Sequence, residues 1–161
     1  MDRIIILGCP GAGKSVFARQ LHEKTGIPLI YLDTLYYRPD GTHIPEERFD
    51  AELQAIMAAP RWILDGHYQR TIPARLAQCD TVLLMDYPPE ICLAGVESRL
   101  GKAREDMPWL ETEFDPVFRN CISHFPEEKM PQVYAWLGAY PGKELHIFHS
   151  RADADAFLRS L

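Results

Sequence analysis

The chain lacks three features that would each have pointed to a particular class of protein. No apolar run approaches the roughly 18 residues that cross a membrane as a helix. The cysteines contain no Cys-x-x-Cys pair and match no zinc-ligand spacing. Basic residues number 17 against 23 acidic ones, for a net charge of -6. These absences argue against a membrane protein, a zinc site and general nucleic-acid binding, which needs many cationic contacts with phosphate.

What remains is the composition of an ordinary globular chain. The 161 residues suffice for one compact domain with a hydrophobic core, so we treat residues 1–161 as a single domain. Cysteines without a disulfide or metal pattern are typical of reducing compartments. The first residues run into a short apolar stretch and a glycine-rich loop rather than a secretion signal. We therefore expect a cytoplasmic protein.

Short apolar runs alternate with segments of helical periodicity along the whole chain. We predict five strands, at residues 3–7, 27–32, 61–64, 81–87 and 144–150. Helices are predicted at residues 14–26, 45–60, 88–100, 114–125, 126–140 and 152–161. Strands that are apolar throughout and separated by helices are typical of a parallel sheet covered on both faces. The predicted fold class is therefore α/β, with a doubly wound parallel sheet of five strands.

One segment between the first strand and the first helix carries a specific motif. Residues 8–15, GCPGAGKS, match G-x-x-x-x-G-K-[ST], the phosphate-binding loop or P-loop, in the required strand-to-helix context. Glycines let backbone N–H groups curl around phosphate oxygens, and the helix N-terminus adds its dipole. In this motif Lys14 reaches the β and γ phosphates, and the Ser15 hydroxyl ligates Mg²⁺. We predict that ATP binds with Mg²⁺ at Gly8, Cys9, Pro10, Gly11, Ala12, Gly13, Lys14, Ser15 and Val16.

The P-loop by itself does not distinguish kinases, GTPases, ATPases and motors. The chain has no Asn-Lys-x-Asp motif of the common GTPases, and motor and AAA-type ATPases usually need more residues. Residues 101–113, GKAREDMPWLETE, have little periodicity and many charges, which favours a mobile flap. A short doubly wound domain with such a flap is typical of small-molecule kinases. Phosphoryl transfer in that format needs Mg²⁺, cations and the exclusion of water.

Two aspartates are predicted at the carboxyl ends of strands, where ligands bind in a doubly wound sheet. Asp65 follows the third strand near the P-loop, so we predict that it holds Mg²⁺ or its water. The alternative is a carboxylate that caps the following turn. Asp33 follows the second strand on the side of the acceptor pocket. It is a candidate general base for an acceptor hydroxyl, a second ligand of Mg²⁺-bound water, or only a helix cap.

Three stretches together resemble the adenylate-kinase group of nucleotide kinases: GCPGAGKS, LDGHYQRT and VLLMDYPPEICLAGVESRL. The chain is more similar still to the family of DNA topology modulation proteins, through residues 32–39, 62–68 and 101–107. This resemblance covers most of the chain. It implies an ATP-binding kinase-like fold with strand order 2-3-1-4-5 and a short lid. We assign residues 33–60 to an acceptor-binding insert and residues 100–114 to the lid.

The resemblance to adenylate kinases also identifies candidates for phosphate contacts. Arg99 lies where those kinases have their first lid arginine, and Arg104 follows in the flap. The planar guanidinium stays charged and binds two phosphate oxygens at once. The catalytic candidates are Lys14, Asp33, Arg99 and Arg104. The acceptor-binding candidates, from the segments after the second and third strands, are Asp33, Tyr36, Arg38, Tyr68 and Arg70.

The chain departs from adenylate kinases where they hold AMP. Where they have Thr-Gly-Asp-x-x-Arg, this chain has DTLYYR at residues 33–38. Arg38 therefore lies two positions farther from the aspartate than the arginine of that motif does. Their Asp-Gly-Phe-Pro-Arg-Thr stretch is one residue longer here, at residues 65–71. We expect ATP-dependent phosphoryl transfer to a small molecule, with a nucleotide or nucleoside acceptor favoured. The alternatives are a hydroxyl-directed kinase of the shikimate or gluconate type, or a non-catalytic ATP-gated regulator that affects DNA topology indirectly.

Overall fold

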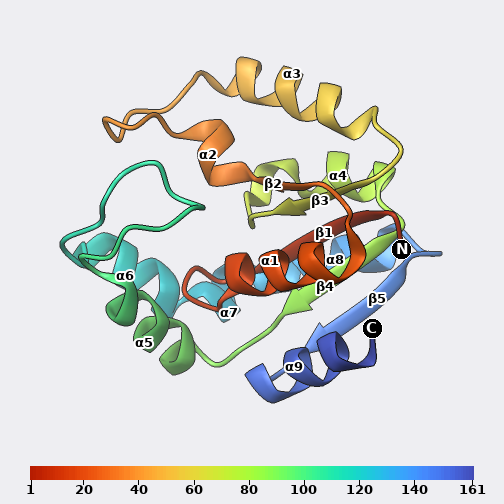
Figure 1. Ribbon diagram of the computed structural model, residues 1–161. Helices are drawn as coiled ribbons and strands as arrows, with labels where there is room; N and C mark the ends of the chain where they lie inside the picture. Colours follow the sequence, from red (N-terminus) through yellow and green to blue (C-terminus); the bar gives the residue numbers. More distant parts are fainter.

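The strands form one parallel sheet in the order β2-β3-β1-β4-β5 (Figure 1). The structure is a computed structural model that describes residues 1–161. The strands are β1 (Arg3–Gly8), β2 (Leu29–Tyr31), β3 (Trp62–Asp65), β4 (Thr81–Met85) and β5 (Glu144–Phe148). All neighbouring pairs run parallel. The predicted fold class and strand order are therefore confirmed.

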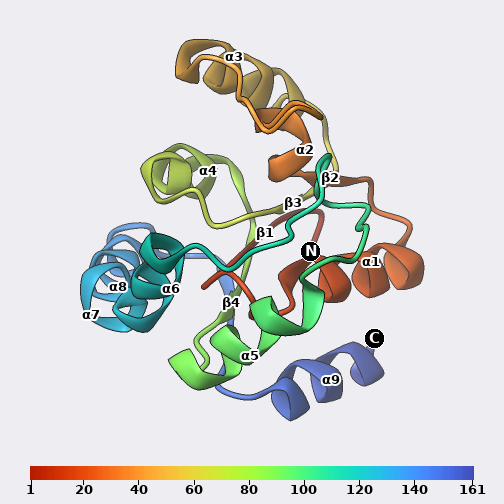
Figure 2. The same ribbon diagram turned by 90° about the vertical axis from the view of Figure 1, so that its left-hand side faces the viewer.

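Helices cover both faces of this sheet. They are α1 (Lys14–Thr25), α2 (Leu32–Tyr36), α3 (Glu46–Met57), α4 (Ile72–Gln78), α5 (Pro89–Arg99), α6 (Pro116–Ser123), α7 (Phe125–Glu128), α8 (Met130–Ala139) and α9 (Arg151–Ser160). Figure 2 shows α1 and α9 on one side of the sheet, with α4 and α8 on the other, as their contacts indicate. None of these helices combines the length and the apolar character needed to cross a lipid bilayer.

Three local features differ from the expectation drawn from the sequence. The short helices α2 and α4 were not predicted, because each is too brief to show a helical period. The predicted helix at residues 126–140 is divided at Lys129 into α7 and α8. Pro131 lies in the first turn of α8, where a proline begins a helix and disfavours continuation from the preceding one.

The centre of the core is strand β1. Ile4, Ile5, Ile6 and Leu7 are each 0% exposed, because helices pack on both faces of the sheet and β3 and β4 flank the strand. Full burial of each such side chain contributes about 1.5–3 kcal/mol. The register places Ile6 beside Asp65 at the end of β3. The rigid core therefore positions the P-loop and Asp65 side by side at the carboxyl edge of the sheet.

Candidate active site

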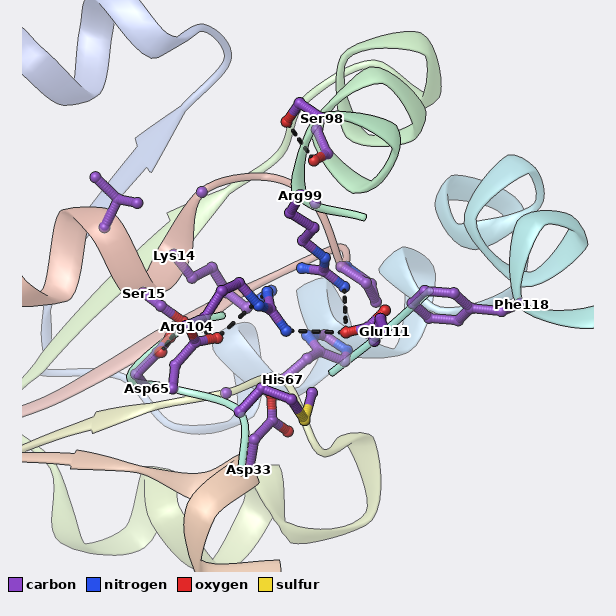
Figure 3. A pocket seen from close by; sticks show the side chains of 18 of the residues that line it. Lys14, Ser15, Asp33, Asp65, His67, Ser98, Arg99, Arg104, Glu111 and Phe118 are labelled. Atoms are coloured by element: carbon purple, nitrogen blue, oxygen red, sulfur yellow. Dashed lines mark hydrogen bonds and ion pairs between the residues drawn. The ribbon is translucent and has the colours of Figure 1, made fainter. Parts of the chain in front are cut away.

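The carboxyl edge of the sheet opens into a pocket of about 790 Å³ (Figure 3). The P-loop, the loop after β3, the end of α5 and residues of the segment 104–115 line this pocket. Most of the predicted site residues are among its lining residues: Pro10, Gly11, Gly13, Lys14, Ser15, Val16, Asp33, Asp65, Tyr68, Arg99 and Arg104. Three other predicted P-loop residues are buried behind this surface: Gly8, Cys9 and Ala12.

Helix α5 packs directly on the P-loop backbone. Gly11 has a left-handed φ of 83°, and a Cβ added there would lie 2.0 Å from the carbonyl oxygen of Cys92. A Cβ added at Gly95 would lie 2.0 Å from the carbonyl oxygen of Gly11. Within the loop, Lys14 Nζ donates a hydrogen bond of 2.9 Å to the Cys9 carbonyl. The loop thus has the curled backbone that binds phosphate, and glycine is required on both sides of its contact with α5.

Asp65 and Ser15 form a paired oxygen site at the end of β3. Ser15 Oγ donates a hydrogen bond of 2.5 Å to Asp65 Oδ2. The other carboxylate oxygen, Asp65 Oδ1, is buried and has no hydrogen-bond partner. Burial raises the pKa of Asp65 to about 6, although Lys14 and Ser15 act in the opposite direction. A buried carboxylate oxygen without a donor, next to a P-loop hydroxyl, fits the hard oxygen ligands that Mg²⁺ prefers.

Asp33 lies within α2 and lines the pocket on the side of β2. Tyr68 Oη donates a hydrogen bond of 2.6 Å to Asp33 Oδ1. Burial raises the pKa of Asp33, whereas the Tyr68 hydrogen bond and the Lys14 charge lower it. Asp33 does not cap the helix: the residue at the N-cap of α2 is Tyr31, and no side chain caps this helix. The helix-cap alternative is therefore wrong, and the two chemical roles of Asp33 stay predictions.

Arg75, which the sequence analysis did not identify, holds the loop after β3. Its fully buried guanidinium donates hydrogen bonds to the carbonyls of Gly66, at 2.8 Å, of His67, and of Tyr68, at 3.2 Å. Tyr68 has a φ of 39°, a left-handed conformation that is unfavourable for a residue other than glycine. The hydrogen bonds from Arg75 thus stabilise the backbone conformation that carries Tyr68 to Asp33.

His67 links the same loop to the P-loop. The Gly8 N–H group donates to His67 Nδ1 at 3.3 Å, so Nδ1 is an acceptor. His67 Nε2 then carries the ring proton and donates to Gln69 Oε1 at 2.5 Å. Burial lowers the pKa of His67 to about 3. His67 is therefore a neutral residue that connects two loops of the site.

Arg99, at the end of α5, and Arg104, in the predicted lid, both point toward Glu111 (Figure 3). Arg104 Nη2 lies 2.9 Å and Arg99 Nη2 3.6 Å from the same oxygen, Glu111 Oε1. Arg99 Nε is buried without a hydrogen-bond partner. Arg104 Nη1 is also 3.5 Å from Asp106 Oδ2. Acidic residues of the predicted lid segment therefore hold the two predicted arginines inside the pocket.

Three predicted acceptor residues do not line the pocket: Tyr36, Arg38 and Arg70. Arg70 Nη2 pairs with Asp50 of α3 at 2.8 Å. Arg38 donates to the carbonyl of His43 at 2.9 Å. Tyr36 packs in an aromatic cluster, where its ring stacks on His43 with centroids 4.7 Å apart. These partners lie in the segment after α2 and in α3, and they turn all three side chains away from the pocket.

Other aromatic residues line this part of the pocket instead. Tyr37 and Trp109 contact each other edge to face, with ring centroids 6.3 Å apart, and both are lining residues. Tyr37 lies near Asp33, whose charge adds to burial in raising the pKa of the Tyr37 hydroxyl. Figure 2 shows the segment between α5 and α6, which carries Trp109, extending to the segment after α2. The sequence predicted that this segment is a flap, but a segment without periodicity could not show which of its residues contacts Tyr37.

Comparison with known proteins gives relationships in sequence and in fold. No family model matches the chain. The chain is 29% identical to the adenylate kinase of Mycobacteroides abscessus, over 80% of this chain and 82% of that protein. It is 26% identical to the adenylate kinase of Agrobacterium fabrum, over 99% of this chain and 95% of that protein. These comparisons do not support the resemblance to DNA topology modulation proteins.

Two solved structures share the fold. A shikimate kinase from Bacteroides thetaiotaomicron has a TM-score of 0.64 at 12% identity, covering 99% of this chain and 95% of that one. A shikimate kinase from Acinetobacter baumannii in complex with shikimate has a TM-score of 0.65 at 17% identity, covering 99% and 90%. Together, the sequence relatives and the shared fold support a P-loop kinase and leave its phosphoryl acceptor undetermined.

Proposed function

We propose that this protein transfers the γ-phosphoryl group of ATP to a hydroxyl group of a small, ring-bearing acceptor, with a nucleoside as the favoured class. The observation that carries the proposal is the hydrogen bond of 2.6 Å from Tyr68 to Asp33 at the wall of the pocket. This bond uses one oxygen of the Asp33 carboxylate and leaves the other for an acceptor hydroxyl. The two arginines of the acceptor segments, Arg38 and Arg70, pair elsewhere.

Each group at the site then has a chemical task. The P-loop N–H groups and Lys14 bind the phosphates of ATP. Mg²⁺, for which Ser15 and Asp65 are the fitting ligands, neutralises phosphate charge when bound. Asp33 accepts the proton of the acceptor hydroxyl as that oxygen attacks the γ-phosphorus and ADP leaves. Burial raises the pKa of Asp33, which makes it a stronger base than an exposed carboxylate.

The end of α5 and the lid segment supply the remaining requirements of phosphoryl transfer. Arg99 and Arg104 bring two guanidinium groups to the pocket, and these groups stabilise the negative charge of the transferring phosphoryl group. Closure of the segment over the acceptor excludes water, which would otherwise compete with the acceptor hydroxyl. The proposal therefore gives catalytic roles to Lys14, Asp33, Arg99 and Arg104.

The residues around Asp33 suit a planar, uncharged acceptor. Tyr37, Tyr68 and Trp109 line the pocket and offer aromatic faces and edges to a ring. The carboxylate of Asp33 repels an acceptor phosphate placed at the same point. A nucleoside carries both a planar ring and hydroxyl groups, so it fits these residues better than a nucleotide does.

A nucleotide acceptor is the second candidate, and the sequence similarity to adenylate kinases favours it. In that case Arg99 and Arg104 are the cations available to an acceptor phosphate, because Arg70 pairs with Asp50 and Glu46 at the surface. The two candidates differ in their need for Asp33. A phosphate nucleophile is already an anion, whereas a hydroxyl needs a base.

The test is ADP formation with a panel of nucleosides, nucleoside monophosphates and hydroxylated ring metabolites. At least one neutral acceptor raises ADP formation well above the rate with ATP alone, and Lys14→Ala abolishes the increase. Asp33→Asn lowers kcat for that acceptor by about 10²-fold to 10⁴-fold. Asp40→Asn is the matched control, since the exposed Asp40 bonds only to Thr42 in the same segment.

Two outcomes would contradict the proposal, one by changing the acceptor and one by excluding a kinase. If only nucleoside monophosphates stimulate turnover and Asp33→Asn loses less than about tenfold, the nucleotide reading replaces ours. If no acceptor raises ADP formation above the basal rate, the kinase proposal itself is wrong.

The compartment and partners follow as part of the proposal. We assign the protein to the cytoplasm, where ATP and Mg²⁺ are available and its four free cysteines stay reduced. The net charge of -6 gives no support to direct nucleic-acid binding.

A further inference from the structure

An acidic residue of the lid segment reaches the P-loop serine. Asp106 Oδ2 lies 3.1 Å from Ser15 Oγ, across 91 positions of sequence. The same hydroxyl is 2.5 Å from Asp65 Oδ2, at the end of β3. Asp106 as a residue is 9% exposed and Asp65 is 4% exposed, so both are largely enclosed. Two buried carboxylates from distant segments therefore converge on one hydroxyl.

The Ser15 hydroxyl cannot supply a hydrogen bond to every carboxylate oxygen around it. A serine hydroxyl has one hydrogen to donate, and two carboxylate oxygens lie within hydrogen-bond distance of it. In addition, Asp65 Oδ1 is buried and has no donor at all. Buried acceptors without donors are costly, because each one has lost its hydration. Arg104 lies 3.5 Å from Asp106 Oδ2 but leaves Asp65 Oδ1 without a partner, so a bound cation would stabilise the point where Ser15, Asp65 and Asp106 meet.

We propose that Asp106 is an additional oxygen ligand of the Mg²⁺ site, supplied by the lid segment, so that the cation joins the lid to the P-loop. Carboxylate and hydroxyl oxygens are the ligands that Mg²⁺ takes in proteins, together with the phosphates of its nucleotide. The inference rests on the proposed binding of ATP with Mg²⁺, and it is independent of the acceptor.

The rival explanation is that Asp106 only orients Arg104. The distances favour the cation site. Arg104 lies 3.5 Å from Asp106 but already has a closer partner in Glu111, at 2.9 Å. Asp106 approaches Ser15 more closely, at 3.1 Å, than it approaches Arg104. Asp106 contacts both Ser15 and Arg104. A cation held by Asp106 therefore also fixes the carboxylate that lies beside Arg104.

Mn²⁺ binding to the protein–ATP complex tests the proposal directly, with free Mn²⁺ counted by its electron paramagnetic resonance signal. Asp106→Asn is isosteric and removes one negative charge from the ligand set. We expect it to weaken Mn²⁺ affinity in saturating ATP by about 10-fold to 100-fold. Glu105→Gln is the matched control, because Glu105 is the adjacent acid, 70% exposed, and pairs only loosely with Arg19 at 3.6 Å. We expect Glu105→Gln to leave Mn²⁺ affinity within about twofold of the unsubstituted protein.

Trp109 in the same segment provides a readout of lid coupling. With ATP present, we expect that adding Mg²⁺ changes the fluorescence of Trp109, and Trp109→Phe identifies that signal. The change disappears in Asp106→Asn and persists in Glu105→Gln. Thermal unfolding of both variants verifies that each one is folded.

The measurements have distinct outcomes. Equal Mn²⁺ affinity in Asp106→Asn and Glu105→Gln overturns the proposal. A loss of metal-free ATP affinity in Asp106→Asn, with Mn²⁺ affinity unchanged, also overturns it and assigns Asp106 to positioning Arg104. A protein that binds ATP and Mn²⁺ as expected but phosphorylates no acceptor refutes the proposed function and leaves this inference standing.

Discussion

The Tyr68 hydroxyl donates a hydrogen bond of 2.6 Å to Asp33 Oδ1, joining residues 35 positions apart in the sequence. Asp33 comes from α2 and Tyr68 from the loop after β3. The bond stabilises the ionised form of a carboxylate whose pKa burial has raised. It therefore controls both the position and the protonation of the proposed base.

Substitution Tyr68→Phe removes this hydrogen bond, and the pKa of Asp33 then rises further, because the bond lowers it in the intact protein. The base works only when it is deprotonated, so activity is lost as pH falls through this pKa. The acidic limb of the kcat/KM profile therefore moves to higher pH. At neutral pH, kcat/KM falls by about 10-fold to 100-fold because Asp33 also loses its orientation.

The control for this profile is Tyr36→Phe, since Tyr36 packs beside Tyr68 but does not line the pocket. An acidic limb at the same pH in Tyr68→Phe and in the unsubstituted enzyme means that Asp33 is not the titrating base.

Gly95→Ala tests the packing of α5 on the P-loop. Alanine in a helix is normally favoured over glycine by about 1 kcal/mol. At Gly95 the added Cβ meets the Gly11 carbonyl at 2.0 Å, so the P-loop backbone must shift. We expect lower thermal stability and at least about tenfold weaker ATP binding, measured by titration calorimetry.

The matched control is Gly138→Ala in α8, where a Cβ meets nothing within 4 Å. This variant gains about 0.5–1 kcal/mol and keeps its ATP affinity. Unchanged ATP affinity in Gly95→Ala contradicts the contact between α5 and the P-loop.

Arg75→Met tests the buried support of the loop after β3. It leaves the carbonyl groups of Gly66 and His67 without the donors that Arg75 provides, whereas the Tyr68 carbonyl keeps two donors from Thr71. We expect a loss of about 3 kcal/mol or more in the free energy of unfolding, measured in urea. Arg48→Met, at an exposed pair with Glu52, is expected to change it by less than about 1 kcal/mol. Similar losses in the two variants would show that Arg75 does not support the loop.

His67 makes the stability of the fold dependent on pH. Burial lowers its pKa to about 3 in the folded protein, whereas an unfolded histidine has a value of 6.5. Between these values the unfolded state binds the additional proton, so this contribution to stability is complete above pH 6.5 and is lost as pH falls. The unsubstituted protein therefore loses stability relative to His67→Gln on acidification, by up to about 1.4 kcal/mol per pH unit.

Urea unfolding of both proteins from pH 7 to pH 4 measures this difference in the free energy of unfolding. Asp65, whose pKa is raised to about 6, has the opposite pH dependence, but it is present in both proteins and its contribution cancels in the difference. His149→Gln serves as the control, because the His149 side chain is 68% exposed. A constant difference between the unsubstituted protein and His67→Gln across this range contradicts the assignment.

Local patterns in the sequence were sufficient to predict the strands, the P-loop and the edge of the sheet where the pocket lies. Apolar runs predicted all five strands: β1, β3 and β4 are buried along nearly their whole length, and the edge strands β2 and β5 are partly exposed. The P-loop motif predicted the turn between β1 and α1, where glycines and the helix N-terminus have a strict local geometry. The carboxyl edge of a parallel sheet then predicted Asp65 near that loop and Asp33 at the rim of the same edge, and both line the pocket.

Pairings between distant charged residues were decided only by the tertiary structure. Arg70 follows the same strand as Asp65, yet Asp50 and Glu46 of α3 draw it away from the pocket. Arg104, Asp106 and Glu111 belong to a charged segment without periodicity, so the sequence could not show which of them face Ser15. A local pattern specifies which face of an element is buried, whereas the partner of a charge depends on which segments the fold brings together. The sequence by itself therefore predicted the reaction class and the phosphate-binding loop, and the tertiary structure decided which residues line the pocket beside that loop.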